Sequence, residues 1–411
     1  MANNPGNNAS VIYPFNKEAI KLSKNYKNGN FGLWFNKFIP INDKYQACGD
    51  KNGEKNTAID LYNGTYENVL NSNKLQYILN NKHYSQYSFY KSYEGRYEAI
   101  IITAELISPL ITGIGQTHPN EVGMTFDHTL GIPYIPASSI KGIARFSHSL
   151  NLLEDLRSEK HYDEIKKDKN DEECFDDEAE WTNISTIFGR GGNKHESNIG
   201  NVIFLDAYPE SVPKLTVDIM NPHYGDYYSG KTPPADYLNP VPIKFLTIAK
   251  HTKFIFRAVI NKAKLSEFKV LVVNAIKKAL TEEGVGAKTA VGYGMFKIEG
   301  NDEPESVKKL IKEKERERES KIEEFEKNKK IKEINNMPKV DGICYELSNN
   351  YDEKRASEIY GALDSYNEED KIKIAKKLKE AYIKAKKWDK KDKLSSKQEE
   401  KIKKIKLILN E

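Results

Sequence analysis

The spacing of apolar and polar positions in the middle of the chain predicts an antiparallel α+β domain. Residues 97–113 read as a β-strand, because β-branched residues partly alternate with polar ones until Pro109 and Gly113 end the run. Apolar residues at helical spacing predict one helix over 138–150, with Ser138 or Ser139 as its N-cap, and a second over 265–283. Further strands are predicted over 199–209, 214–220, 241–250, 252–260 and 293–298, with 241–250 and 252–260 forming a hairpin-like pair.

Without its insertions, the segment 97–298 runs strand–helix–strands–helix–strand. That order predicts a split βαβ, ferredoxin-like fold, in which an antiparallel sheet carries two helices on one face. The same architecture presents an open sheet face and loops to RNA in several modules. Fold alone does not define function, so the chemistry of individual segments has to supply it.

Changes in composition divide the 411 residues into parts. We expect a Tyr/Asn-rich extension that packs on the core (1–95), the ferredoxin-like domain (96–300) with an acidic insertion (151–199) and a Tyr/Pro loop (221–240), a charged helical linker (301–340) and a basic helical tail domain (341–411). Aromatic residues interleaved with Lys in the extension could stack on bases, but a packing layer is the favoured interpretation. Pro338 and Gly342 are expected to break the linker helix.

The formal net charge of +4 hides a strong segregation. Residues 154–180 hold 13 acidic and 5 basic side chains, a balance of −8, whereas 371–406 hold 16 lysines and 5 acidic side chains, a balance of +11. A solvated face explains each run as well as a binding surface does. The segregation nevertheless suggests surfaces that face different partners.

Composition also argues against several classes of protein. No apolar run reaches the eighteen or so residues of a membrane span, and the first residues lack the pattern of a secretory signal, so we expect a cytoplasmic protein. Cys48, Cys174 and Cys344 lie far apart and form no CxxC pair, so neither disulfides nor a zinc site are expected. We expect no cofactor and no metal.

The segment 284–294, GVGAKTAVGYG, is the most informative motif. Four glycines in eleven residues allow positive φ and a close approach of a partner to the backbone. Exposed N–H groups with a lysine and a threonine suit a phosphate. The spacing matches neither the P-loop nor the dinucleotide fingerprint, and a tight structural turn is about equally compatible. The candidate binding residues here are Gly284, Gly286, Lys288, Thr289, Gly292, Tyr293 and Gly294.

A second motif, GIPYIPASSIKGIARFS (131–147), opens the first predicted helix. Together with 284–296, the loop 113–131 and the segments 204–209, 217–224 and 241–248, it resembles the RAMP superfamily of CRISPR-associated RNA-binding proteins. Within that superfamily the order of motifs is similar to the type III-B effector subunit nearest the 3′ end of the guide RNA. Position 137 is Ala where the family pattern generally has Gly.

The resemblance implies a non-catalytic, RNA-binding structural subunit. Its partners would be the CRISPR guide RNA, the target RNA paired with it and neighbouring RAMP subunits, without a membrane. Lys141 and Arg145 support this, since they lie one turn apart near a helix N-terminus, where N–H groups already favour phosphate. Ser138, Ser139, Lys141, Arg145 and His118 therefore join the glycine loop as candidate RNA contacts, and the two motifs are expected to converge at one sheet edge.

Two alternatives remain open. A RAMP endoribonuclease that cuts guide precursor or target RNA would need a general acid and base, and His118, His128, His195 and His223 lie in predicted loops without a partner that compels a dyad. Asp127, Asp206 and Asp218 could bind a metal only if the fold gathered them. The third class is a protein-interaction module, in which the tail and the loop 221–240 dock onto neighbouring proteins.

Overall fold

The computed structural model describes residues 29–39, 41, 58–70, 73–159, 178–190, 197–221, 230, 233, 242–336, 339–349, 352–388 and 394–411. The chain divides into two compact units, residues 1–312 and 313–411, which are described separately. Most of the Tyr/Pro loop, the acidic segment 160–177, Cys48 and Cys174 lie outside the described residues. Among the described helices, none is long and apolar enough to cross a membrane.

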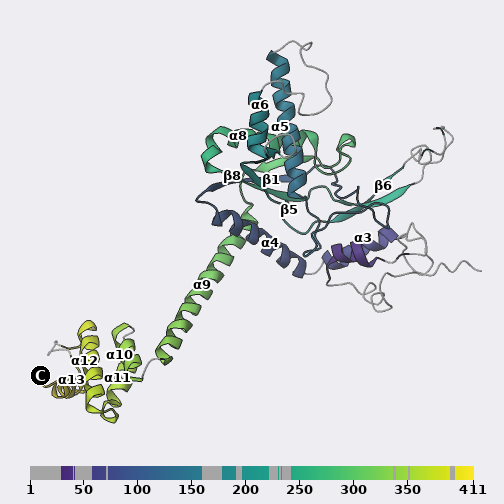
Figure 1. Ribbon diagram of the computed structural model, residues 1–411. Coiled ribbons are helices and arrows are strands. Elements are labelled where there is room, and N and C mark those ends of the chain that lie inside the picture. The colour runs from purple at the N-terminus through teal and green to yellow at the C-terminus, as the bar shows by residue number, and fades with distance from the viewer. Residues whose placement is uncertain are drawn as a thin grey trace, which may run out of the picture. The chain divides into compact units, whose positions relative to one another are not determined.

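An antiparallel sheet forms the centre of the first unit (Figure 1). The strands β4 (Val202–Phe204), β8 (Lys253–Asn261), β1 (Tyr97–Leu106) and β9 (Phe296–Gly300) lie side by side in that order, and β5 (Tyr208–Pro209) also pairs with β8. β1 and β8 pair along their whole length, from Tyr97 opposite Asn261 to Glu105 opposite Lys253. The prediction of an α+β domain on an antiparallel sheet is confirmed.

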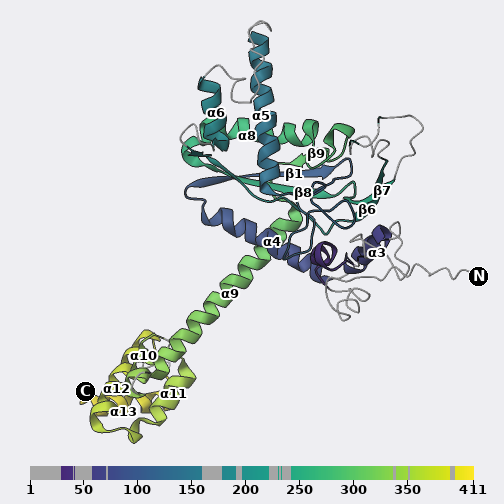
Figure 2. The ribbon, with the colours of Figure 1, turned by 45° about the vertical axis from the view of Figure 1, so that its right-hand side comes forward.

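Three of the described helices cover one face of this sheet (Figure 2). They are α5 (Ala137–Glu159), α6 (Glu178–Phe188) and α8 (Leu265–Lys278), which continues as a π-helical turn over Ala279–Glu283. Every second residue of β8 points to them, and Phe254, Phe256 and Ala258 share a buried cluster with Ala144 of α5 and Val272 of α8. The period-2 pattern of the strand and the helical pattern of α5 and α8 thus meet in one core.

The opposite face of the sheet is covered as well, so the sheet presents no open face in the described part of the unit. α4 (Asn73–Ser92) crosses it below the strands (Figure 2). The first turns of α9 (Glu305–Asn336) pack there too, where Val307 and Ile311 are buried with Ile255 of β8. The two-helices-on-one-face architecture that we expected is therefore incomplete.

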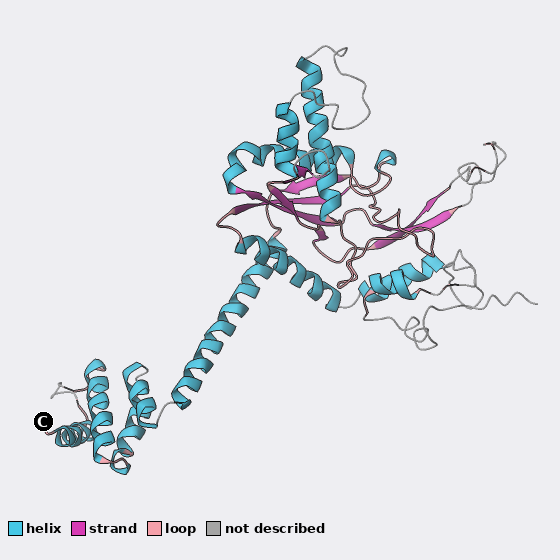
Figure 3. Cartoon of the chain, viewed as in Figure 1, coloured by secondary structure: helices cyan, strands magenta, loops and turns pink. Residues whose placement is uncertain are grey.

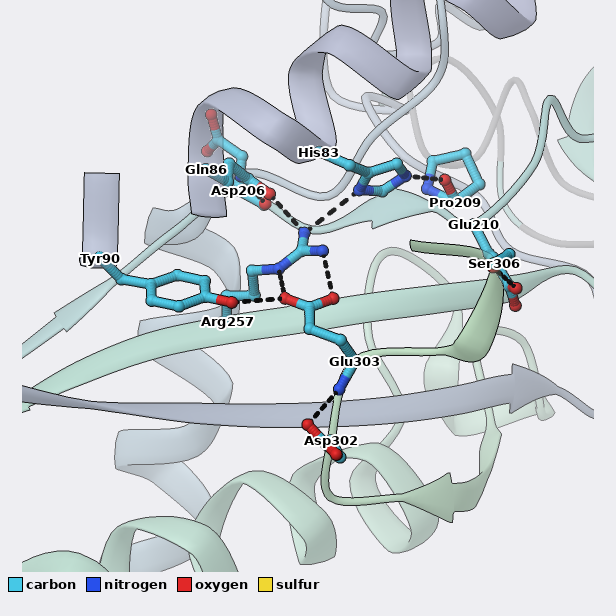
Figure 4. A network of polar contacts seen from close by, with 10 residues as sticks. All are labelled: His83, Gln86, Tyr90, Asp206, Pro209, Glu210, Arg257, Asp302, Glu303 and Ser306. Atoms are coloured by element: carbon cyan, nitrogen blue, oxygen red, sulfur yellow. Dashed lines mark hydrogen bonds and ion pairs between the residues drawn. The ribbon is translucent and has the colours of Figure 1, made fainter. Parts of the chain in front are cut away.

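A buried polar network joins α4 to the sheet (Figure 4). Arg257 of β8 forms two 2.7 Å contacts with the Glu303 carboxylate, from Nε to Oε1 and from Nη2 to Oε2. Its Nη1 donates to Gln86 Oε1 at 2.7 Å and lies 3.2 Å from His83 Nδ1. His83 Nε2 lies 2.9 Å from the Pro209 carbonyl oxygen, so the ring donates to the carbonyl and accepts from the guanidinium. Burial, and then the charge of Arg257, lower the pKa of His83 to about 3.

The described residues of the N-terminal segment belong to the main core. Phe31 of α2 (Phe31–Leu33), Phe35 of the π-helical turn Trp34–Phe38 and Tyr66 of α3 (Ala58–Leu70) are fully buried in the same cluster as the sheet. Tyr66 Oη donates a 2.7 Å hydrogen bond to the Pro213 carbonyl oxygen. This contact links α3 to the segment that precedes β6.

The predicted pairing of 241–250 with 252–260 is wrong. β7 (Ile243–Ile248) pairs with β6 (Leu215–Met220) as a separate two-stranded sheet (Figure 3), while β8 joins the main sheet. The chain turns between β7 and β8 at His251, whose φ is +65°, and the His251 N–H donates to the Leu106 carbonyl oxygen. The two segments are adjacent in the sequence, which favoured a hairpin. Because β8 pairs with β1 and β7 pairs with β6, the two strands do not pair with each other. A further short pair is β2 (Gly189–Arg190) with β3 (Asn198–Ile199).

Beyond α9, the described part of the second unit holds four helices around a core of its own. They are α10 (Lys339–Asn349), α11 (Glu353–Gly361), α12 (Glu368–Lys384) and α13 (Ser396–Leu409), with a 3₁₀ turn at Leu363–Ser365. Side chains of Asp352, Asn367 and Ser395 cap three of them. Gly342 lies buried inside α10, so the prediction that it breaks a helix is wrong. Several lysines of this unit pair with carboxylates, as Lys404 does with Asp364.

Candidate nucleic-acid interface

The two sequence motifs meet at one cavity of about 320 Å³. Ser139, in the first turn of α5, lines one side of the cavity, and Gly284, Gly286 and Thr289 of the glycine loop line another. The motifs lie far apart in the sequence, and the fold brings them together because α5 and α8 pack side by side on the sheet. Lys141, Arg145 and Lys288 do not line the cavity itself.

The N-terminus of α5 forms the first wall. Its first N–H group, that of Ala137, donates to Asp206 Oδ1 at 2.8 Å, so a carboxylate of the chain already caps this end of the helix. The side chains of Ser138, Ser139 and Lys141 are exposed, and Arg145 is half-buried one turn further along. Of these residues only Ser139 lines the cavity.

The glycine loop forms the second wall, and its conformation requires glycine at two positions. Gly286 has φ +96°, and a Cβ there would lie 2.3 Å from the Ile111 carbonyl oxygen. Gly294 has φ +70°, and a Cβ there would lie 1.9 Å from the Val285 carbonyl oxygen. The loop is closed by a 2.9 Å bond from Val285 N to Gly294 O. No acceptor among the described residues faces the N–H groups of Gly286 and Lys288, which leaves both available to a ligand.

Lys288 and Tyr293 connect the glycine loop to the β6–β7 hairpin. Lys288 adopts the left-handed conformation, and its Nζ lies 3.4 Å from Met220 Sδ and 5.5 Å from the centre of the Phe245 ring. Tyr293 Oη donates to Asp218 Oδ2 at 2.7 Å, and burial together with this bond raises the pKa of Tyr293 to about 12. The cation of the loop therefore lies beside the β6–β7 hairpin and not in the lining of the cavity.

The third wall comes from the loop 113–131, which carried part of the family resemblance, although only His118 of that loop was named as a candidate contact. Residues 112–115, which follow β1, line the cavity together with Thr125. Gly113 has φ +82°, and a Cβ there would lie 2.6 Å from Thr125 Oγ1. The Thr125 N–H donates to the Thr112 carbonyl oxygen at 3.1 Å, which holds the two segments together. The glycines at 113 and 115, directly after an apolar strand, were the available signal.

His118 is held by the fold. Its ring stacks on Phe35 with 4.5 Å between centroids, Nε2 lies 3.1 Å from the Phe35 carbonyl oxygen, and Nδ1 accepts from the Asn120 N–H at 3.1 Å. Burial lowers the pKa of His118, and the bond to Phe35 only partly opposes this effect. The neutral ring thus joins the N-terminal segment to the loop that forms the third wall.

Asp127 anchors the far end of the same loop. Its Oδ1 accepts from Thr129 N, Thr129 Oγ1 and Leu130 N, and its Oδ2 accepts from Tyr208 Oη at 2.6 Å. Burial acts to raise the pKa of Asp127, but these hydrogen bonds outweigh it and lower the pKa. Among the described residues, no group of three His, Cys, Asp or Glu side chains could hold a metal ion, and Asp127, Asp206 and Asp218 are engaged in separate contacts.

The fold and the two converging motifs define a class of protein. The RAMP superfamily matches residues 103–297, the span that contains the end of β1, all of α5 and α8, the glycine loop and the first residues of β9. Residues 103–297 thus form a RAMP-superfamily domain.

Within this superfamily the chain is similar to Cmr6 of type III-B complexes. It is 28% identical over 344 residues to the CRISPR system Cmr subunit Cmr6 of Pyrococcus furiosus, a match that covers 68% of this chain and 98% of that protein. It is 30% identical over 178 residues to the CMR subunit Cmr6 of Saccharolobus solfataricus, covering 43% of this chain and 48% of that protein.

Two solved structures are also similar to this chain. The crystal structure of Cmr6 from Pyrococcus furiosus has 32% sequence identity and a TM-score of 0.31, with coverage of 49% of this chain and 99% of that chain. A chain in the cryo-EM structure of the type III-B Cmr-beta bound to cognate target RNA has 23% sequence identity and a TM-score of 0.41. This match covers 60% of our chain and 72% of that chain.

Proposed function

We propose that this chain is a non-catalytic, RNA-binding structural subunit of a type III-B CRISPR effector complex in the cytoplasm. It would hold the 3′ part of the guide RNA and the guide–target duplex at the end of the RAMP filament, in contact with a neighbouring RAMP subunit, in antiviral defence. The observation that carries the proposal is the convergence of the 131–147 and 284–296 motifs on one cavity. The similarity to Cmr6 supports the assembly in which this would happen.

The core supports the proposal through its strand order. β1 lies between β8 and β9, β4 lies outside β8, and α5 and α8 follow β1 and β8 in the chain. We interpret this as a ferredoxin-like core with long insertions. In such a core the start of the first helix and the end of the second meet at one end of the sheet, where a nucleic-acid backbone could cross both.

RNA would be held there by its sugar–phosphate backbone. Phosphates would lie at the rim of the cavity, near the exposed Lys141 and the Nζ of Lys288, and would accept hydrogen bonds from the N–H groups of Gly286 and Lys288. Contacts of this kind position RNA without reading its sequence. They also make the affinity depend on salt, because each neutralised phosphate releases counterions.

A double substitution, Lys141→Ala with Lys288→Ala, tests the proposal in the reconstituted effector complex. We expect weaker binding of every guide sequence to about the same degree. The slope of log K against log salt should be shallower by about 0.7 for each single-strand phosphate that the variant no longer neutralises. Lys269→Ala is the matched control, since Lys269 of α8 pairs with Glu98 of β1 and neither residue lines the cavity. Weakening confined to particular guide sequences, or a salt slope equal to that of the control, would contradict the backbone contact.

The ribonuclease alternative requires a histidine that is free to exchange a proton with RNA. His118 uses both ring nitrogens within the chain, and His83 and His148 are buried. We therefore expect His118→Ala to leave RNA cleavage by the assembled complex intact. Disappearance of the cut in this variant, with guide binding unchanged, would favour the enzyme.

A further inference from the structure

The end of the central sheet at which β1 begins carries a cluster of aromatic side chains. α4 ends there and the chain turns into β1 (Figure 2). The Phe89 and Tyr93 rings are in contact, with 5.1 Å between centroids, and Tyr93 contacts Tyr97 at 6.3 Å. Phe89 is 37% exposed and Tyr93 is 49% exposed. A contiguous group of exposed aromatic side chains, unlike a single one, marks an interaction site. This aromatic cluster precedes residue 103, so the match to the RAMP superfamily assigns no role to it.

Two cations lie beside the aromatic cluster without a carboxylate partner among the described residues. The Arg96 guanidinium carbon lies 5.7 Å from the centre of the Tyr97 ring. The Lys262 N–H donates to the Arg96 carbonyl oxygen at 3.0 Å, which keeps these two exposed residues adjacent. The carboxylates of the segments 85–98 and 259–270 are each paired with a lysine, in the pairs Lys91–Glu94, Lys264–Glu267 and Lys269–Glu98. The positive charges of Arg96 and Lys262 are therefore left uncompensated on this surface.

The composition of this surface matches that of protein interfaces. The centres of such interfaces are enriched in aromatic residues and arginine, and their rims are polar. Here three aromatic rings and one arginine lie together, with ion pairs on the adjoining turns of α4 and α8. Tyrosine and arginine are also among the side chains whose truncation most often weakens a complex strongly.

A single-stranded nucleic acid is the alternative occupant, and the geometry disfavours it. The planes of Phe89 and Tyr93 meet at 55°, and those of Tyr93 and Tyr97 meet at 88°. Successive bases stack on open ring faces, whereas these rings pack against one another and Arg96 lies over the ring of Tyr97. The Glu94 side chain is 62% exposed, and its charge would repel a phosphate. A protein partner fits these features better than RNA does.

We propose that this surface binds a protein whose contact face is apolar at its centre and carries carboxylates opposite Arg96 and Lys262. The aromatic cluster would fill an apolar recess of the partner, and a carboxylate would accept two hydrogen bonds from the guanidinium. This contact is additional to the RNA contact proposed above. β1 has 10 residues, so about 30 Å separate its first residue from its last, beyond which the residues that line the cavity begin. Protein and RNA can therefore be bound at the same time.

Photo-crosslinking of the full-length chain in the assembled effector complex tests the proposal. p-Benzoylphenylalanine at position 93 should crosslink to a peptide of another protein, one that contains Asp or Glu beside apolar residues. The same probe at position 77 is the matched control, since Tyr77 is 60% exposed on the same helix but lies about 24 Å away along its axis. It should not reach that peptide. A crosslink from position 93 to RNA, or no crosslink at all, would overturn the proposal.

Charge exchange with the crosslinked protein provides the second measurement. Arg96→Glu should weaken the binding of that protein by about 30-fold, the effect of removing one strongly contributing interface residue. Replacing the partner's crosslinked carboxylate residue by lysine should restore most of the affinity, because the ion pair is then reversed. Lys250→Glu is the matched control, since Lys250 is exposed in the turn before β8, at the other end of that strand. A loss that the partner substitution does not restore, or an equal loss in the control, would overturn the proposed pairing.

RNA affinity measured on the same variants separates this surface from the cavity. Arg96→Glu should leave guide-RNA affinity unchanged, and the variant with Lys141→Ala and Lys288→Ala should leave the protein contact unchanged. If the two lysine substitutions do not weaken RNA binding while Arg96→Glu still releases the partner, the proposed function fails and this inference stands. If Arg96→Glu weakens RNA binding as strongly as protein binding, the surface binds RNA and this inference is wrong.

Discussion

Glu303→Gln is expected to destabilise the first unit strongly. The Glu303 side chain is 4% exposed and that of Arg257 is 1% exposed, and the carboxylate accepts two bonds from the guanidinium and a 3.2 Å bond from Tyr90 Oη. The amide keeps the shape of the side chain but removes the charge and replaces one acceptor by a donor. Arg257 would then keep a buried charge with neutral partners alone, which are Gln86, His83 and the remaining amide oxygen.

The expected magnitude follows from this arrangement. Removing one partner of a buried ion pair costs about 3–5 kcal/mol, because the remaining charge is left uncompensated. That is a large part of the roughly 5–15 kcal/mol that stabilise a typical domain. Hydrogen exchange measured by mass spectrometry on the full-length chain is a suitable assay, since peptides from β1 and β8 report the opening of this unit independently of the second unit. Exchange there should be faster by about two to four orders of magnitude.

The control is Glu299→Gln, the same substitution four residues earlier. Glu299 and Lys253 are 3.5 Å apart with 30% and 47% of their side chains exposed, so this surface pair should contribute less than about 1 kcal/mol. Equal exchange in the two variants would refute the assignment of the network as a major stabilising element. Replacing both partners, Arg257→Met with Glu303→Leu, should be less damaging than Glu303→Gln alone, because no charge stays buried.

Two further predictions concern pH and the glycine loop. The pKa of His83 falls from 6.5 to about 3 on folding, so the unfolded chain binds a proton at a higher pH than the folded chain does. The free energy of unfolding should therefore decrease as the pH drops below 6.5, by up to about 1.4 kcal/mol per pH unit from this group. The urea midpoint of His83→Gln should vary less between pH 7.5 and 5 than that of the wild type. Gly294→Ala should displace the loop and lower the melting temperature more than Gly292→Ala does. Both residues have positive φ, but only at position 294 would a Cβ meet another atom, 1.9 Å away. Equal melting temperatures of the two variants would contradict this.

The sequence was informative where a pattern repeats within one element. The helices α5 and α8 and the strands β1 and β8 follow from apolar residues that recur at the period of one face. The hairpin of β7 and β8 was wrong because strand pairing depends on hydrogen bonds to β6 and β1, which are distant in the sequence. Local patterns contain no information on that choice.

The candidate site shows the same limit. Ser139, Gly284, Gly286 and Thr289 were predicted, and they do share a cavity, because each lies in a motif with its own chemistry. Thr112 was missed, since a threonine at the end of an apolar strand has no distinctive signature. Arg257 did carry a signal: a lone arginine within FIFRAVI implies a buried partner, although the identity of that partner could not be read from the sequence.

Covering of both sheet faces restricts how this protein can meet RNA. In modules that bind RNA on an open sheet, bases stack on side chains of the central strands. Here the central strand β8 contributes Phe256 to the helical face and Arg257 to the network under α4, and both residues are 2% exposed. Access in the described part of the unit is therefore concentrated at the end of the sheet where β1 stops, α5 begins and the glycine loop returns. Since the cavity at that end has no charged residue in its lining and Lys141 and Lys288 lie outside it, substitutions of the two lysines can test backbone binding without changing the cavity.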